Sequence, residues 1–462
     1  MPYERPADED PPGAARRAPG RRDLLRMLPA LGGFAALGGG TRAWAAQAEH
    51  AAGTGAGHPA APGARHPAGG ITRAGTRTDV NGRADGDDAG SGGSGRGGRG
   101  VGVSGIVKPL PEDVFVVHGT NAETRWEALG DVGHLVPNDR FFVRNHTSTP
   151  LIDAATWRLR VHGSGVRRPH EFRYDDLRAL PSVTLDAAIE CAGNGRSFFG
   201  SQQGSPAPGT PWRLGGIGVA RWRGVPLATV LRLAGLLPGA VDVLPRGLDA
   251  PFVSDGVDLG PVRRPLPVAK ALKDVLLAYE MNGEPLPPDH GFPVRLVVPS
   301  WIGIASIKWV GDIEVSAEPL SSPWDTRFYR MFGPGHPAGG GPPLTTQVVK
   351  SAFELPWDAS LPAGRSHVLR GRSWSGTGRI VRVEVSTDGG GTWRPADLRG
   401  PRQRAAWSSW RLTWRPPGPG VHTLLARATD ETGATQPAVT PHNTFGYLFD
   451  AVVAHPVTVF TP

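Results

Sequence analysis

The stretch Glu190-Cys191-Ala192-Gly193-Asn194-Gly195-Arg196-Ser197-Phe198-Phe199 holds the only cysteine of the chain and directly follows the mostly apolar run 183–189. That run predicts a buried strand, and the two glycines allow the backbone to turn sharply just beyond the thiol. Arg196 and the amides of the turn would favour the thiolate, which suits a nucleophile or a ligand for a soft metal. Because most lone cysteines are small buried hydrophobic residues, the residues by themselves leave both interpretations of Cys191 open.

The composition limits what else the chain does. A chain of 462 residues is expected to form two or three domains, since single hydrophobic cores stop growing near roughly 250–300 residues. One cysteine excludes an intramolecular disulfide framework. The formal net charge is +8, but no basic helix and no ribbon of basic and aromatic residues stands out. We therefore predict no nucleic-acid binding, and no transmembrane span in the mature protein.

The N-terminal segment shows the features of an export signal in their usual order. Paired arginines precede the short apolar run 27–37, and Ala43-Trp44-Ala45 offers small residues for a signal peptidase. Residues 1–45 thus resemble a twin-arginine signal peptide, which places the mature protein in the periplasm or outside the cell. Residues 46–105 are rich in Gly, Ala and Arg and nearly free of aromatic residues, which predicts a disordered linker.

Residues 106–335 are predicted to form a domain of the α+β class. Strands and helices mix without a regular βαβ rhythm, which argues against a doubly wound sheet. Apolar alternation and turn signals predict strands at 157–162, 184–189, 294–298 and 307–315, and helical patterns predict helices at 226–234 and 266–277.

Residues 345–462 are predicted to form an all-β, immunoglobulin-like sandwich. Short alternating strands are separated by turns every 8–12 residues, as in such sandwiches, here without a disulfide. The clearest hairpin, at 386–393, also looks like the Asp-box turn of glycan-processing propellers, although it occurs once and without a repeat. An exported adhesion or glycan-binding protein is therefore one alternative to an enzyme.

Two polar clusters accompany the cysteine turn in the α+β domain. One is Phe141-Phe142-Val143-Arg144-Asn145-His146, and the other joins His290-Gly291-Phe292-Pro293-Val294-Arg295 to Ser306-Ile307-Lys308-Trp309. Arg and Lys bind phosphate, and His, Asn and Ser supply further donors. Each cluster alone is better explained as a solvated surface loop, because most charged side chains are solvated. Their presence in one domain favours a site for a polyanionic ligand.

Together these motifs resemble the sulfite oxidase family of molybdenum-cofactor oxidoreductases, in its bacterial exported form. The resemblance runs from about residue 108 to the C-terminus, and the order and spacing of its motifs make it specific. It rests on the segments 142–146, 191–196, 247–249, 277–287, 290–295 and 306–309.

The resemblance implies roles for individual residues. Cys191 would be the protein's ligand to molybdenum, which is carried by molybdopterin. Arg144, Arg196 and Trp212 would line the pocket for the anion, and Tyr329 would be the active-site tyrosine. The pterin and its phosphate would be held by Phe142, Val143, Arg144, Asn145, His146, Asp249, His290, Arg295, Ser306, Ile307 and Lys308.

The implied reaction is a two-electron oxygen-atom transfer that converts sulfite to sulfate. The electrons would leave to an external acceptor such as cytochrome c, and the sandwich would form a homodimer. No haem is expected, because one cysteine excludes a Cys-x-x-Cys-His attachment and the His-Pro-Ala-Gly-Gly turns at 66–70 and 336–340 lack a haem-binding module. Phe445 stands where the family usually has an arginine, so another oxyanion or a neutral sulfoxide is an alternative substrate, and sulfoxide reduction an alternative activity.

Overall fold

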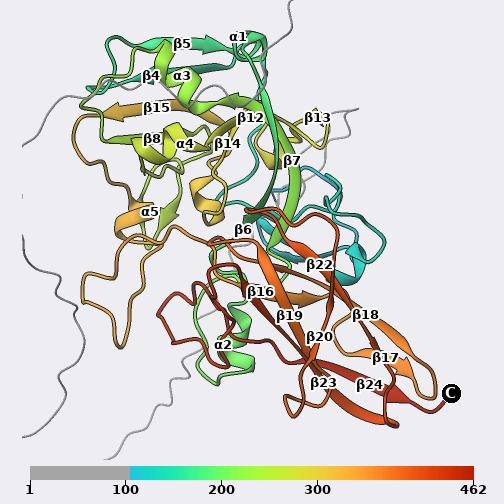
Figure 1. Ribbon diagram of the computed structural model, residues 1–462. Coiled ribbons are helices and arrows are strands. Elements are labelled where there is room, and N and C mark those ends of the chain that lie inside the picture. Colours follow the sequence, from blue (N-terminus) through green and yellow to red (C-terminus); the bar gives the residue numbers. More distant parts are fainter. Residues whose placement is uncertain (1–104) are drawn as a thin grey trace, which may run out of the picture. The chain divides into compact units, whose positions relative to one another are not determined.

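The computed structural model describes residues 105–462, which belong to one compact unit (Figure 1). The predicted signal peptide and all but the last residue of the predicted linker lie outside the described residues. Within residues 105–462, no helix is long and apolar enough to cross a bilayer. The elements divide into a mixed part, which runs from the first strand to residue 326, and a sandwich, which begins at residue 350.

The mixed part is built mainly from short strands. They are β1 (Phe115–His118), β2 (Asn121–Thr124), β3 (Val143–Arg144), β4 (Arg158–His162), β5 (His170–Arg173), β6 (Val183–Glu190), β7 (Ile217–Pro226), β8 (Asp242–Gly247), β9 (Val253–Ser254), β10 (Val257–Asp258), β11 (Leu266–Pro267), β12 (Leu276–Met281), β13 (Glu284–Pro285), β14 (Arg295–Val297) and β15 (Val310–Ser316). One sheet has the order β11-β8-β15-β4-β5 and is antiparallel except between β15 and β4. The other has the order β13-β12-β7-β6, with β14 also paired to β12. A three-stranded sheet, β1-β2-β3, and the hairpin β9-β10 complete the mixed part.

The helices are few and short. They are α1 (Tyr174–Ala179), α2 (Ser197–Ser201), α3 (Leu227–Leu233), α4 (Val268–Lys273) and α5 (Pro323–Thr326), with 3₁₀ turns η1 (Trp126–Leu129), η2 (Pro288–His290) and η3 (Gly303–Ala305). The prediction of a single helix over residues 266–277 was wrong: α4 covers only the middle of this range, and strand β12 begins at Leu276. Leu276 to Ala278 are buried between β7 and β14, and a continuous apolar run of this kind looks alike in a buried helix and a buried strand.

The sandwich is all β, as predicted. Its strands are β16 (Lys350–Phe353), β17 (Ala359–Pro362), β18 (His367–Trp374), β19 (Ile380–Ser386), β20 (Arg394–Pro395), β21 (Asp397–Arg399), β22 (Ser408–Trp414), β23 (Gly420–Asp430) and β24 (His455–Phe460). They form two sheets, β16-β18-β22-β21 and β17-β24-β23-β19-β20. The fold class predicted from the sequence, a mixed part followed by an all-β sandwich, is therefore confirmed.

The hairpin at 386–393 is a closed structural turn. The Asp388 carboxylate accepts hydrogen bonds from the Ser386 hydroxyl (2.7 Å) and from the Thr392 hydroxyl (2.6 Å) and amide (2.9 Å). These donors hold the pKa of Asp388 well below its usual range. The side chain that would mark a glycan-binding turn is thus used within the turn itself.

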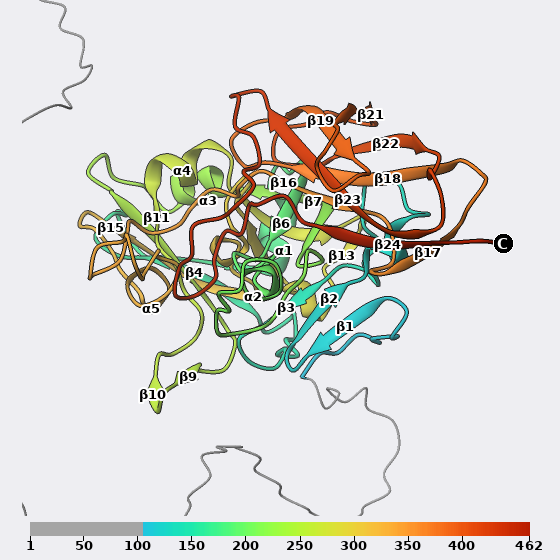
Figure 2. The ribbon, with the colours of Figure 1, turned by 90° about the horizontal axis from the view of Figure 1, so that it is seen from below.

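One hydrophobic core crosses from the mixed part to the sandwich. Trp126 of η1 stacks on Trp374 of β18 at a centroid distance of 6.0 Å, and its ring lies 5.9 Å from that of Trp407. Figures 1 and 2 both show β16 next to the end of β6, where the cysteine turn begins. Because large aromatic side chains bury much apolar surface, this shared core fixes the sandwich against the cysteine turn.

Candidate active site

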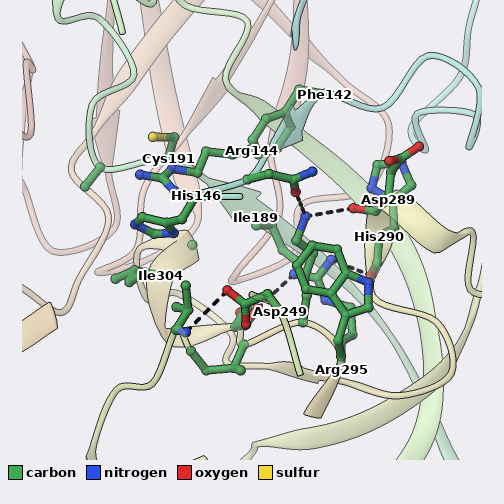
Figure 3. A pocket seen from close by; sticks show the side chains of 18 of the residues that line it. Phe142, Arg144, His146, Ile189, Cys191, Asp249, Asp289, His290, Arg295 and Ile304 are labelled. Atoms are coloured by element: carbon green, nitrogen blue, oxygen red, sulfur yellow. Dashed lines mark hydrogen bonds between the residues drawn. The ribbon is translucent and has the colours of Figure 1, made fainter. Parts of the chain in front are cut away.

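A cavity of about 710 Å³ opens where β6 ends (Figure 3). Its walls come from segments far apart in the sequence, and their residues converge on the end of the β13-β12-β7-β6 sheet. The lining residues fall in 141–146, 189–192, 289–295 and 303–309, together with Asp249, Val262 and Tyr329.

Most of the residues predicted from the sequence to form a site line this cavity. They are Phe142, Arg144, Asn145, His146, Cys191, Asp249, His290, Arg295, Ser306, Ile307, Lys308 and Tyr329. Sequence reasoning missed Asp289, Val262, Gly303 and Ile304. Asp289 could have been predicted as a lining residue, because it precedes His290 in the same turn. Nothing in the local sequence marks Val262, Gly303 or Ile304 as lining residues.

The cysteine turn follows β6 directly. The Cys191 amide donates to the Gly216 carbonyl (2.9 Å), and the Cys191 carbonyl accepts from the Asn194 amide (2.9 Å), which closes the turn beyond the thiol. Gly195 has a φ of +95°, and a Cβ there would lie 3.0 Å from the Cβ of Phe449. Both the conformation and the contact therefore require glycine at this position.

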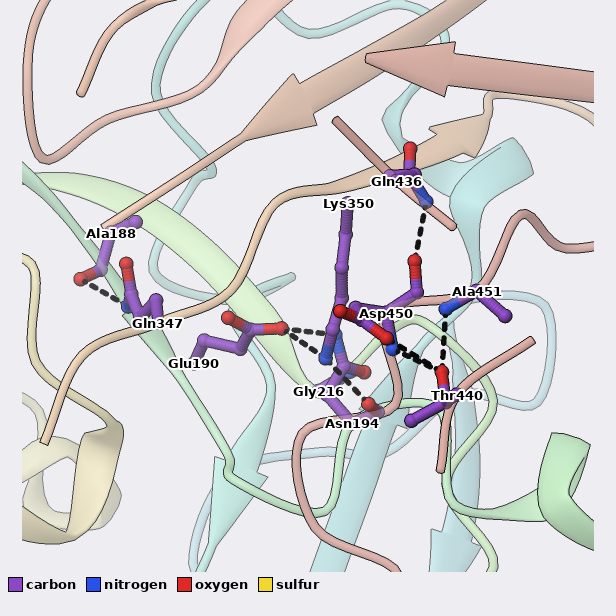
Figure 4. A network of polar contacts seen from close by, with 10 residues as sticks. All are labelled: Ala188, Glu190, Asn194, Gly216, Gln347, Lys350, Gln436, Thr440, Asp450 and Ala451. Carbon is purple, nitrogen blue, oxygen red and sulfur yellow. Dashed lines mark hydrogen bonds and ion pairs between the residues drawn. The ribbon is translucent and has the colours of Figure 1, made fainter. Parts of the chain in front are cut away.

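A buried polar network lies behind this turn (Figure 4). The Lys350 ammonium of β16 donates to the Glu190 carboxylate (2.8 Å) and to the Asn194 carbonyl (2.7 Å), and both charged side chains are 2% exposed. The Asn194 side chain donates to Glu190 (3.1 Å) and accepts from the Gly216 amide (2.9 Å). The residue before the cysteine is thus tied to the sandwich by an ion pair.

Arg144 places its guanidinium beside the Cys191 thiol (Figure 3) and also interacts electrostatically with Tyr329. Within residues 105–462, its Nη1 is buried and has no hydrogen-bond partner, and the same holds for Nε2 of His290. Buried polar atoms without partners are rare in folded proteins because each one has lost its water. Two of them in one cavity indicate that a polar ligand belongs there.

Lys308 lies at the other end of the cavity. Its ammonium donates to the Asn145 side-chain oxygen and to the Asp289 carbonyl (2.8 Å). Burial, with the neighbouring Arg295 adding to it, lowers the pKa of Lys308 well below its usual value. A bound anion at this end would reverse that effect by stabilising the charged form.

Arg295 frames the same end by joining two loops. Its guanidinium donates to the His290 carbonyl (3.0 Å) and the Ser306 carbonyl (3.0 Å). Burial lowers the pKa of Arg295 to about 9, so it remains a cation at neutral pH. Five guanidinium N–H groups are available to an arginine, so these bonds leave donors for a ligand.

The two histidines of the cavity are kept neutral. Burial, followed by Arg144, lowers the pKa of His146 well below its usual value, and burial, followed by nearby lysines, does the same for His290. Nε2 of His146 accepts a hydrogen bond from the Trp324 indole (3.0 Å). The positive charge of the cavity therefore comes from arginine and lysine.

Tyr329 and Asp249 complete the lining. Burial raises the pKa of Tyr329, so its phenol stays protonated and can donate a hydrogen bond. Burial also raises the pKa of Asp249, whose carboxylate accepts from the Val262 amide (3.3 Å). Tyr329 has a left-handed backbone, with φ of +54°, which is uncommon for an aromatic residue.

Val143, Arg196 and Trp212 do not line the cavity. Val143 points into the small core beside β1, and Trp212 is 1% exposed, with its ring 6.2 Å from the ring of Phe142. The Arg196 guanidinium donates to the carbonyls of Thr210 (2.9 Å) and Phe445 (2.8 Å). Strand pairing orients Val143, the shared core holds Trp212, and backbone carbonyls hold Arg196.

The residues of the cavity fit a molybdopterin-bound metal. Residues 105–462 hold no group of three or more His, Cys, Asp or Glu side chains placed to bind a metal ion, so a metal at the free Cys191 thiol needs donors supplied by a cofactor. A thiolate suits a soft metal, and the cations around Lys308 suit a phosphate. The unpartnered Nη1 of Arg144 supplies a further donor, and Nε2 of His290 a further polar atom.

Comparison with known proteins agrees with this chemistry. Residues 146–324 match the family model of the oxidoreductase molybdopterin-binding domain, and residues 348–457 match that of the Mo-co oxidoreductase dimerisation domain. The mitochondrial sulfite oxidase of Mus musculus is 37% identical over 333 residues, which cover 69% of this chain and 60% of that protein. Sulfite oxidase of Gallus gallus is 38% identical over 337 residues, covering 69% of this chain and 71% of that protein.

A solved structure is also similar. The sulfane dehydrogenase SoxCD from Paracoccus pantotrophus superposes with a TM-score of 0.64 at 30% sequence identity, over 72% of this chain and 83% of that one. The chain spans 60% of the length of the mouse sulfite oxidase. On these grounds the chain is a molybdopterin oxidoreductase with a dimerisation domain and belongs to the sulfite oxidase family.

Proposed function

We propose that this enzyme oxidises sulfite to sulfate by oxygen-atom transfer and passes the electrons to a separate acceptor, such as a cytochrome c. The observation that carries the proposal is the meeting of the Cys191 thiol, the Arg144 guanidinium and the Tyr329 phenol in one cationic cavity. A small dianion is attracted to such a cavity, and a soft thiolate suits molybdenum. Sulfite oxidases are also among its relatives.

The bound cofactor supplies the two-electron redox chemistry, and the chain supplies binding and orientation. Arg144 would orient the oxyanion beside Cys191, using the guanidinium nitrogen that has no partner in residues 105–462. The protonated phenol of Tyr329 would donate a hydrogen bond to the same oxyanion. Because the Tyr329 side chain and the Arg144 Nη1 atom are buried, each of these interactions is stronger than at a surface.

The opposite end would hold the pterin and its phosphate. Lys308 and Arg295 present donors there, His290 presents its unpartnered Nε2, and Asp249 accepts one hydrogen bond already, from Val262. A phosphate bound to Lys308 would offset the burial that lowers its pKa. The charge of the cavity and that of the cofactor are thus complementary.

Sulfoxide reduction is the second candidate, and the position of Phe445 favours it. The Phe445 ring packs against Phe328 (5.9 Å) and Phe332 (5.7 Å), so at this position the sandwich supplies no cation that would attract a dianion. A neutral sulfoxide would not need such a cation. Assaying both directions of oxygen transfer separates the two candidates.

Two further proposals concern the protein in the cell. The arginine pair and apolar run within residues 1–45 support export by the twin-arginine route, to the periplasm or beyond. The match of residues 348–457 to a dimerisation domain supports a homodimer. Light scattering of the purified protein and fractionation of cells that express the full chain test these two points.

The decisive experiment measures metal, pterin and turnover on one preparation. Protein made with adequate molybdate should contain about one molybdenum and one pterin per chain, and should reduce ferricyanide or cytochrome c with sulfite. Cys191→Ser should keep the pterin and lose turnover, because a hydroxyl is a poor ligand for a soft metal. Ser360→Ala, on β17, is the control. Folded protein without metal, or turnover in Cys191→Ser equal to that of the control, would refute the proposal.

A further inference from the structure

The backbone conformation of Tyr329 depends on contacts from outside its own segment. It is the lining residue with the phenol, yet it sits in a left-handed conformation that costs energy for an aromatic residue. It follows α5 and lies near the junction with the sandwich. Its backbone carbonyl accepts one hydrogen bond, from the Leu344 amide (2.8 Å). A strained conformation persists where surrounding contacts enforce it.

Tyr447 supplies such contacts from the β23–β24 connection of the sandwich. Its ring stacks on the ring of Tyr329, with a centroid distance of 5.1 Å and an interplanar angle of 13°. Its hydroxyl also interacts electrostatically with the backbone of Tyr329. Tyr447 therefore contacts both the phenol ring of Tyr329 and the strained backbone that carries it.

Tyr447 is itself held firmly. The Asn443 side chain accepts from the Tyr447 amide (2.9 Å) and donates to the Tyr447 carbonyl (2.9 Å). The next amide, that of Leu448, donates to the Ala192 carbonyl (2.8 Å), which joins this connection to the cysteine turn. Tyr447 is 6% exposed. Its position is thus set by the same turn that carries the thiol.

Arg196 lies over the Tyr447 ring. Its guanidinium carbon is 5.6 Å from the ring centroid, and its Nε donates to the carbonyl of Phe445, two residues earlier. A Cβ on Gly446 would lie 2.8 Å from Cγ of Arg196, so the connection approaches this arginine as closely as glycine permits. One tyrosine therefore links the cysteine turn, through Arg196, with Tyr329.

We propose that Tyr447 is a positioning residue that fixes the orientation of the Tyr329 phenol in the cavity. The sandwich thereby shapes the substrate end of the site without lining it. The effect on turnover rests on the function proposed above, in which Tyr329 binds the substrate. The effect on the conformation of Tyr329 does not, and it can be measured without any assay of activity.

The structural test uses fluorine NMR. The chain has five tyrosines, so enzyme labelled with 3-fluorotyrosine gives few resonances, and Tyr329→Phe assigns the one of interest. Tyr447→Leu removes a ring stacked at 5.1 Å and should shift or broaden the Tyr329 resonance, while those of Tyr174 and Tyr279 stay in place. An unmoved Tyr329 resonance overturns the proposal. If Tyr447→Leu does not fold, Tyr447→Met, which also removes the ring but keeps a long apolar side chain, replaces it, and an unchanged resonance there overturns the proposal equally.

The kinetic test is a double-mutant cycle. Tyr447→Leu should lower kcat/KM, and should lower it no further in a Tyr329→Phe background, because both changes remove one interaction. Phe353→Leu, which removes a buried ring elsewhere in the sandwich, should act independently of Tyr329→Phe. Independent, multiplicative effects of Tyr447→Leu and Tyr329→Phe overturn the proposal. If wild-type enzyme does not oxidise sulfite, the proposed function fails, and the fluorine measurement still decides the role of Tyr447.

Discussion

The two ends of the cavity are built in different ways. At the Lys308 end, these contacts all stay within the mixed part: Arg295 binds carbonyls 5 and 11 residues away, and Lys308 binds the Asp289 carbonyl 19 residues away and the Asn145 side chain 163 residues away. At the Cys191 end, Lys350 binds Glu190 across 160 residues, and Arg196 binds the Phe445 carbonyl across 249. The Lys308 end is thus assembled by loops of the mixed part, whereas the Cys191 end also depends on the sandwich.

This difference has a functional meaning. A phosphate site needs several donors facing one space, which a pair of adjacent loops can provide. A reacting centre needs groups fixed to a small fraction of an ångström, and packing against a second body restricts them more tightly. Changes in the sandwich should therefore affect the chemistry more than the retention of the pterin.

The largest effect is expected from breaking the ion pair behind the cysteine. Lys350→Met leaves the Glu190 carboxylate buried without its cation, which should cost about 3–5 kcal/mol of unfolding free energy. Urea unfolding of the holoenzyme measures this loss. The control is Arg399→Met, which breaks an exposed pair with Asp397 and should cost less than about 1 kcal/mol. Equal losses in the two variants would mean that the metal end does not depend on this contact.

The second-largest effect is expected from acid, which should lower the unfolding free energy of the sandwich. Burial lowers the pKa of His455 to about 4, and its Nε2 lies 3.0 Å from the Pro356 carbonyl. The unfolded chain, with a histidine pKa near 6.5, binds the proton first, so stability falls as the pH drops from about 6.5 to about 4. The full loss of unfolding free energy is roughly 3 kcal/mol, because the histidine pKa is about 4 in the folded chain and near 6.5 in the unfolded chain.

His455→Gln should remove this part of the pH dependence. Unfolding midpoints measured between pH 4 and pH 7 should slope less steeply in the variant than in the wild type. His336→Gln, outside the sandwich, is the matched change and should keep the wild-type slope. A slope left intact by His455→Gln would show that other groups govern the acid response.

The smallest effect is expected at the Lys308 end, where several donors share the task. Lys308→Met should remove one hydrogen bond between charged groups, worth about 1.5–3 kcal/mol, and so weaken pterin retention by roughly 10- to 100-fold. Pterin fluorescence after dialysis measures retention. Lys270→Met, on α4, is the control and should retain the pterin. Full retention in Lys308→Met would place the phosphate elsewhere.

Much of the site was predictable because its residues stand in short runs. Asn145 and His146 follow Arg144, and Ser306 and Ile307 precede Lys308, so each of these two short segments carries several of the lining groups. Asp289 was missed although it adjoins His290, because its role is to accept hydrogen bonds from the Lys108 amide and from Thr149. That role depends on a segment 140 or more residues away.

The direction of side chains was not predictable. Trp212 was expected in the anion pocket, but its ring packs within the shared aromatic core. Helix 266–277 was overextended because a fully buried strand, here β12, has no alternation to distinguish it. In both cases the observed structure depends on packing against segments that are distant in the sequence. Trp212 packs against Phe142, and β12 pairs with β7 and β14.

The amino-acid sequence was enough to predict which chemical groups are available: one thiol after a strand, glycines that let the chain turn, and basic and polar runs suited to a polyanion. These are properties of neighbouring residues, and local spacing is enough to express them. Which of these groups meet, such as Arg144 beside the thiol and Lys350 behind it, depends on the fold of the whole chain. It also stacked Tyr447 on Tyr329. Such pairings depend on how two distant bodies share one core, and no local pattern encodes that packing.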